Sequence, residues 1–180
     1  MNPVKRIALI VGLAVLGTAA VGQTGNSEST SALRGHDTNA PVDVAADRIE
    51  VQDRADRAVF SGNVVVKQAE MTLTAARLTV AYANSGGIQI QRLDASGGVT
   101  VTSPTETARG AFAIYDLNDK IITMLGGVTL TRGASHVTGA RLVIDLNSGR
   151  AVMDGGGAPG TTNTGNGRVT GTFTVPQRKS

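Results

Sequence analysis

Polar and apolar residues alternate along most of the chain from Val42 onward. The alternation is clearest in the segments RIEV, VVVK, MTLTA, RLTVAY, IQIQRL, VTVT, VTLT and RLVIDL. A period of two, rich in Val, Ile and Thr, is typical of β-strands that bury one face. No segment after Leu16 has helical periodicity over ten or more residues. The pattern therefore predicts an all-β domain over residues 42–156.

The alternating segments form a sequence repeat. Gly97–Gly127 aligns without gaps with Gly126–Gly156 at an offset of 29 residues, and both copies contain GGVT, DLN and a closing GG. A fainter copy starts at Ser61. Short polar breaks such as LNSGR favour antiparallel hairpins. The Gly-Gly pairs allow the bends by which a strand passes from one sheet into a facing sheet.

Two facing antiparallel sheets joined at glycine corners predict a jellyroll-like sandwich built from repeated strand-turn-strand units. Repeats of this size also occur in stacked structures, so a parallel β-solenoid is the alternative. A solenoid would require the apparent hairpin turns to have another role.

Alignment of the copies identifies a set of inward-facing positions, which are mostly aliphatic and which alternate with Thr, Lys or Asn. The predicted inward-facing residues are Ile49, Val51, Val64, Val66, Leu78, Val80, Val99, Val101, Tyr115, Val128, Leu130, Leu142 and Ile144. Such a set can form a closed core or line a groove. For any single residue, a place in a closed core is the simpler interpretation.

Residues 1–22 have the layout of a secretory signal peptide. Lys5 and Arg6 precede an apolar run from Ile7 to Leu16, and small residues follow. The run is too short for a bilayer core of ~30 Å, which takes roughly 20 residues to span. We therefore predict export and cleavage after residue 20 or 22, with a retained N-terminal anchor as the alternative.

The remaining segments outside the repeat are rich in small and polar residues. Residues 23–41 are predicted to form a flexible leader, and residues 157–167 a Gly/Thr linker. Residues 168–180 contain RVTGTFTVP, which resembles the closing strand of a known family of β-proteins, and are predicted to form that strand and a tail.

Composition narrows the functional classes. The chain has no Cys, so the exported domain is held together without disulfides. Loss of Lys5 and Arg6 with the signal peptide would reduce the 17 basic residues to 15, against 14 acidic residues, for a net charge of +1. The basic residues are spaced singly without aromatic partners, which argues against a nucleic-acid interface.

Candidate catalytic chemistry is sparse. The sequence has no Cys nucleophile and no nucleophile-elbow motif, so we predict that the protein is not an enzyme. A catalytic pair distant in sequence is the minor alternative. His36 and His136 have no evident ligand partners, and we predict neither a metal site nor a cofactor.

Two segments resemble the OstA-like family of lipopolysaccharide-transport proteins. They are ADRIEVQDRADRAVFSGNVVVKQAEMTLTAARLTV at residues 46–80 and GARLVIDLNSGRAVM at residues 139–153. The resemblance implies a twisted, partly open β-jellyroll whose apolar interior takes lipid A acyl chains in the periplasm. It also implies stacking from head to tail, through sheet edges, into a bridge between an inner-membrane transport complex and an outer-membrane β-barrel translocon.

Applied to this chain, the resemblance assigns the inward-facing residues to the lining of a lipid groove. Three Phe and no Trp would make that lining mainly aliphatic. The candidate contacts for lipid phosphates are Arg48, Lys67, Arg77 and Arg141, which a solvated strand face explains equally well. Two further alternatives are a membrane-tethered component of the same machine and a β-repeat adhesin or scaffold without a ligand.

Overall fold

The computed structural model describes residue 33 and residues 35–84, 86–156 and 167–174. The predicted signal peptide, part of the leader, most of the linker and the end of the tail lie outside these residues. One 3-10 turn, Asp53–Ala55, interrupts a chain of β-strands. The strands are β1 Val42–Ala45, β2 Arg48–Gln52, β3 Arg57–Gln68, β4 Met71–Ala83, β5 Gln89–Thr102, β6 Glu106–Asp116, β7 Ile121–Arg132, β8 Ser135–Asp145, β9 Arg150–Asp154 and β10 Thr170–Thr172.

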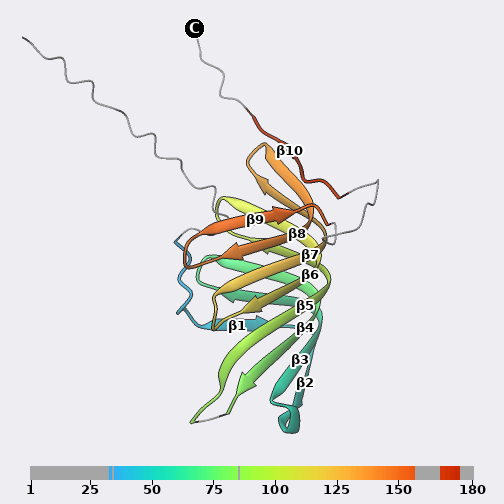
Figure 1. Ribbon diagram of the computed structural model, residues 1–180. Coiled ribbons are helices and arrows are strands. Elements are labelled where there is room, and N and C mark those ends of the chain that lie inside the picture. The colour runs from blue at the N-terminus through green and yellow to red at the C-terminus, as the bar shows by residue number, and fades with distance from the viewer. Residues whose placement is uncertain (1–32, 34, 85, 157–166, 175–180) are drawn as a thin grey trace, which may run out of the picture.

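All strands belong to one ten-stranded sheet with antiparallel pairing throughout. The order is β1-β3-β4-β5-β6-β7-β8-β10, with β2 also paired to β3 and β9 also paired to β8. Figure 1 shows the strands stacked in chain order, from β2 at one end to β9 and β10 at the other. The prediction of an all-β, partly open antiparallel jellyroll is confirmed, and the parallel solenoid is not the fold.

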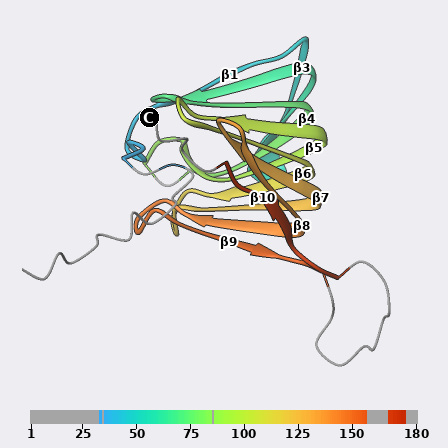
Figure 2. The same cartoon turned by 90° about the horizontal axis from the view of Figure 1, so that it is seen from above.

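Each long strand bends once, so the single sheet folds into two facing halves. The β2–β9 half contains β2, β9 and residues 57–61, 77–83, 89–96, 112–116, 121–125 and 141–145. The β1–β10 half contains β1, β10 and residues 64–68, 71–75, 99–102, 106–109, 128–132 and 135–139. In Figure 2, β1 and β9, which belong to different halves, lie on opposite sides.

Glycines form the corners between the halves. At Gly126 (φ 85°) an added Cβ would lie 2.6 Å from the Cβ of Ala111 on β6. The preceding copy repeats this contact, with Gly97 (φ 84°) 2.6 Å from the Cβ of Ala76 on β4. The positive φ and the close approach both exclude a side chain. Successive copies of the 29-residue repeat therefore share their glycines because each corner has the same backbone conformation and the same close contact.

The first corner is looser. The glycine there, Gly62 (φ 79°), faces the side chain of Asp47, which links β1 to β2. The Asp47 carboxylate accepts a hydrogen bond from the Asn63 amide at 2.8 Å, and the Asp47 backbone N–H donates to the Gly62 carbonyl at 2.9 Å. One side-chain and one backbone hydrogen bond therefore hold the link between the short strands β1 and β2 against the corner of β3.

Candidate functional site

Two rows of inward-facing side chains cross the β2–β9 half from end to end. The first row is Val51, Ala58, Val80, Leu93, Tyr115, Ile122, Ile144 and Ala151. The second row is Ile49, Phe60, Leu78, Ala95, Ala113, Met124, Leu142 and Met153. Neighbouring strands lie ~4.8 Å apart, so each row runs for roughly 33 Å along the stack.

The β1–β10 half supplies the facing side chains. Its paired row is Val44, Val66, Leu73, Val101, Ala108, Leu130 and Val137. Val64, Val99 and Val128 are buried next to the corners. Leu130 is half-buried and packs against the core.

Between the terminal strands of the stack the interior is filled by side chains. Leu78, Ile122 and Val128 are 0% exposed, and Leu142 and Ile144 are 1% exposed. Val64, Val66, Val80, Val99, Val101 and Tyr115 are also buried. These residues therefore form a closed core in this structure.

At the β1–β2 end the same rows are open. Ile49 and Val51 are each 56% exposed, although Ile49 lies in the same row as the buried Leu142, and Val51 in the same row as the buried Ile144. They line a cleft of about 450 Å³ that we call the β1–β2 cleft. Its other apolar lining residues are Val42, Val44, Ala58, Phe60, Val80, Tyr82, Ile88 and Ile90. The cleft therefore gives the apolar interior an opening to solvent.

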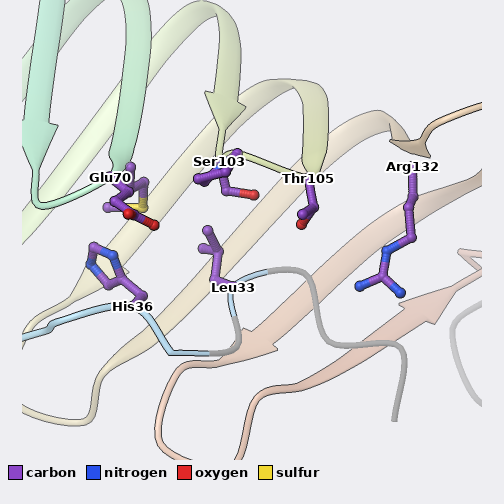
Figure 3. Close-up of a pocket in the computed structure, with 8 residues that line it drawn as sticks. Leu33, His36, Glu70, Ser103, Thr105 and Arg132 are labelled. Carbon is purple, nitrogen blue, oxygen red and sulfur yellow. The ribbon is translucent and has the colours of Figure 1, made fainter. Parts of the chain in front are cut away.

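A second opening lies at the turns of the β1–β10 half that are farthest from the glycine corners. Leu33 and residues 35–40, which we call the strap, cross this side of the molecule. Leu33 is only 6% exposed. In Figure 3 it points from the strap toward Ser103 and Thr105 in the β5–β6 turn, with His36 and Glu70 to one side and Arg132 to the other. These residues line a pocket of about 280 Å³ beside the strap.

Gln68, at the end of β3, fastens the strap. Its Nε2 donates to the carbonyl oxygens of Thr38 at 3.1 Å and Ala40 at 3.0 Å. Its Oε1 accepts from the Tyr115 hydroxyl at 2.9 Å and lies 3.1 Å from His36 Nε2. Burial raises the pKa of Tyr115 to about 12, although the bond to Gln68 acts in the opposite direction. The phenol therefore stays neutral and keeps its proton for Gln68.

An ion pair between a buried carboxylate and a partly exposed arginine lies close to the strap. Glu106 is 6% exposed and pairs with Arg132 across β6 and β7. Burial raises the pKa of the Glu106 carboxyl, while the charge of Arg132 and its hydrogen bond oppose the rise. A polar rim therefore borders the apolar interior on this side.

The four basic residues predicted to contact phosphates lie elsewhere. Arg48, Arg77 and Arg141 precede inward-facing residues of the β2–β9 half and point to its outer face, and Lys67 lies on the outer face of the β1–β10 half. All four are exposed. Contact with lipid phosphates stays a prediction, and here it would take place on the outer surface.

The strap was missed by sequence analysis, which assigned these residues to a flexible leader. Leu33 is the last apolar side chain of any size before the strands begin, and Gln68 continues the inward period of β3. That inward Gln was the available signal, because a buried amide requires polar partners.

Among residues 33, 35–84, 86–156 and 167–174, no group of three or more His, Cys, Asp or Glu could hold a metal ion. Within the same part of the chain, no helix has the length and apolar character needed to cross a membrane.

Comparison with known proteins identifies the family. Residues 43–150 match the family described as LptA/(LptD N-terminal domain) LPS transport protein. The chain belongs to this family. The match starts in β1 and ends at the first residue of β9, so the matched region takes in both rows from β2 to β8 and all of the β1–β2 cleft except Val42.

Two other proteins resemble the chain. An uncharacterized protein of Rhizobium meliloti (strain 1021) is 29% identical over 128 residues, covering 66% of this chain and 69% of the relative. The crystal structure of LptH, described as the LptA homologous periplasmic component of the lipopolysaccharide transport device from Pseudomonas aeruginosa, has a TM-score of 0.65 at 20% identity. That match covers 78% of this chain and 99% of LptH, and it shows a common fold.

Proposed function

We propose that this protein is a periplasmic lipopolysaccharide-binding bridge component that carries the acyl chains of lipid A in its apolar interior. The observation that supports this most directly is the pair of rows that stay apolar from β2 to β9 and open to solvent at the β1–β2 cleft. Its family membership places it among lipopolysaccharide-transport proteins. Its role is to bind and pass on a lipid, and not to catalyse a reaction.

A carrier of this kind must replace the water around an acyl chain with an apolar surface. Exposure costs ~0.8 kcal/mol per CH₂, so a chain of about a dozen carbons costs on the order of 10 kcal/mol in water. The β1–β2 cleft, at about 450 Å³, falls within the ~300–1,000 Å³ usual for ligand sites. We assign it as the first site for acyl chains. Binding along the closed centre would require the two halves to move apart.

Head-to-tail stacking would extend the rows from one copy to the next. The β2–β9 half presents β2 at one end and β9 at the other, and strand direction alternates through all eight of its strands. In a copy displaced along the stack, β9 would therefore meet β2 in antiparallel orientation, as β-augmentation requires. Ile49 and Val51 would then adjoin Met153 and Ala151, and the cleft would be covered.

The same free edges are our proposed docking sites for the inner-membrane complex and the outer-membrane translocon. In this proposal residues 1–22 act as a cleaved signal peptide that directs the protein to the periplasm. Mass spectrometry of the mature N-terminus distinguishes a cleaved carrier from a membrane-tethered component, which would keep its first 22 residues.

Photo-crosslinking tests lipid binding directly. Benzoylphenylalanine is placed at Val51, which faces the cleft, or at Glu50, which is exposed on the outer face of the same strand. Host lipopolysaccharide should crosslink at Val51 and not at Glu50. Equal labelling at both positions, or labelling at neither in a folded protein, would reject the groove and favour an adhesin or scaffold.

A further inference from the structure

The strap crosses one side of the molecule, and its first residue, Leu33, enters the apolar interior. Leu33 shares a small cavity with Val101 and Ala108 of the β1–β10 half and with Ile144 of the β2–β9 half. These three side chains are at most 3% exposed. Leu33 therefore lies between the two halves, among residues of the proposed lipid lining, although it belongs to neither half.

The strap also satisfies a buried polar group. A Gln amide has two N–H donors and an oxygen with two acceptor sites. The two Gln68 donors are directed to the Thr38 and Ala40 carbonyls, and the oxygen faces Tyr115 and His36. Gln68 is 2% exposed. If the strap withdrew, the two donors would face the interior and would need other carbonyl or carboxylate oxygens.

We propose that the strap occupies the place of a bound acyl lipid and is displaced when the lipid binds. In the lipid-free protein, Leu33 occupies the space between Val101, Ala108 and Ile144 that the first carbons of the acyl chain take in the complex. The carbonyls of Thr38 and Ala40 accept hydrogen bonds from Gln68 in the lipid-free protein. In the complex, Gln68 donates instead to the ester or amide carbonyl that joins an acyl chain to its headgroup. This inference rests on the proposed function and adds a second acyl site with its own occupant.

The attachment of the strap suits a replaceable segment. Leu33 is its one buried residue, while residues 35–40 are half-buried or exposed. The pocket of about 280 Å³ beside Leu33 also contacts Met71 and Pro104, so apolar space is already present next to the anchor. A lipid could begin to bind there before Leu33 leaves.

The absence of Cys makes the position of Leu33 directly measurable, because Leu33→Cys introduces the only thiol. In the lipid-free protein this thiol should react slowly with a small thiol reagent. Saturating host lipopolysaccharide should raise the rate at least tenfold. Phe112→Cys, at a position 52% exposed on the outer face, is the control and should react at the same rate with and without lipid.

The outcomes separate this inference from the proposed function. Crosslinking of lipid at Val51 with no change in Leu33→Cys reactivity would show that the strap is a fixed cover, and would overturn this inference alone. Failure of lipopolysaccharide to crosslink at Val51 or to bind in a sedimentation assay would overturn both.

Kinetics provide an independent test. Leu33→Ser removes the apolar anchor and should raise the association rate of lipopolysaccharide several-fold, whereas Leu33→Met keeps an apolar anchor and should leave the rate near that of the wild type. Thermal unfolding of both variants checks that the domain is folded. Unchanged or slower association in a folded Leu33→Ser protein would contradict a displaceable strap.

Discussion

Leu142 and Ile49 occupy the same row of one sheet and yet have opposite surroundings. Leu142, on β8 beside the terminal strand β9, is 1% exposed, and Ile49, on the terminal strand β2, is 56% exposed. Both side chains point inward in strands with the same alternating pattern. The difference is that the other half covers Leu142 and leaves Ile49 beside a cleft. Alternation decides which face a residue takes, and the fold of the sheet decides whether that face is covered.

This difference suggests a division of labour. The filled interior supplies most of the hydrophobic stabilisation, because this stabilisation is proportional to the apolar area that is removed from water. The open end contributes less to stability and keeps apolar surface available for a lipid or for the next copy. Four measurements would sharpen or break this division.

The largest contrast should come from truncating the two residues of the shared row. Leu142→Ala should lower the free energy of unfolding by about 2–5 kcal/mol, because it leaves a cavity in a closed core. Ile49→Ala should cost less than ~1 kcal/mol, since its side chain is more than half exposed. Urea denaturation of both variants measures the difference. Similar losses would mean that the end is covered in solution.

The corners should show a smaller contrast of the same kind. Gly126→Ala and Gly62→Ala both place a side chain at positive φ, which costs ~1–2 kcal/mol. At Gly126 the new Cβ also clashes with Ala111, which adds about 1–3 kcal/mol of overpacking. At Gly62 it displaces only the Asp47 side chain, and with it the bond from Asn63. Thermal unfolding should therefore rank Gly126→Ala as the more damaging, and the reverse order would refute tight central corners.

Substitutions at the open β1–β2 end should affect the association between copies more than they affect the stability of the domain. Ile49→Asp places a charge in the surface that a second copy would cover, and it should weaken end-to-end association about tenfold, or ~1.4 kcal/mol. Sedimentation velocity over a range of concentrations measures this. Glu50→Ala, on the outer face, is the matched control. If both variants associate as the wild type does, the β1–β2 end is not the contact surface.

The smallest effect concerns Tyr115. Tyr115→Phe removes one bond to Gln68, whose oxygen keeps His36 as a neighbour, and should cost about 0.5–1.5 kcal/mol at neutral pH. The folded pKa of about 12 exceeds the unfolded value of 10.0, so the folded state holds this proton longer. Its contribution is complete below pH 10 and is lost as pH rises toward 12.

Absorbance titration tests this assignment in a Tyr82→Phe background, where Tyr115 is the only tyrosine. The phenol should stay protonated at pH 10 in the folded protein. Half-ionisation near pH 10 would show that Tyr115 is solvated and that the centre of the interior is less closed than described.

Alternation and the repeat were enough to predict the all-β antiparallel fold, the glycine corners and the shared row of Ile49 and Leu142. They left out Leu93, Ile122 and Met124, because the positions aligned in the β2–β9 half came from β2, β4, β6 and β8, whereas these residues lie on the parts of β5 and β7 in that half. The exposure of Ile49 could not be predicted, since cover depends on long-range packing. The strap was missed because one Leu among polar residues carries no periodic signal.

The 29-residue repeat also sets how such a domain can change in length during evolution. One repeat adds two strands to the sheet, or roughly 10 Å to the stack. Because two is an even number, duplication or loss of a unit leaves the direction of both terminal strands unchanged. Domains with different numbers of units would therefore keep compatible ends, so an organism could adjust the length of a chain of such domains without altering the surfaces by which they join.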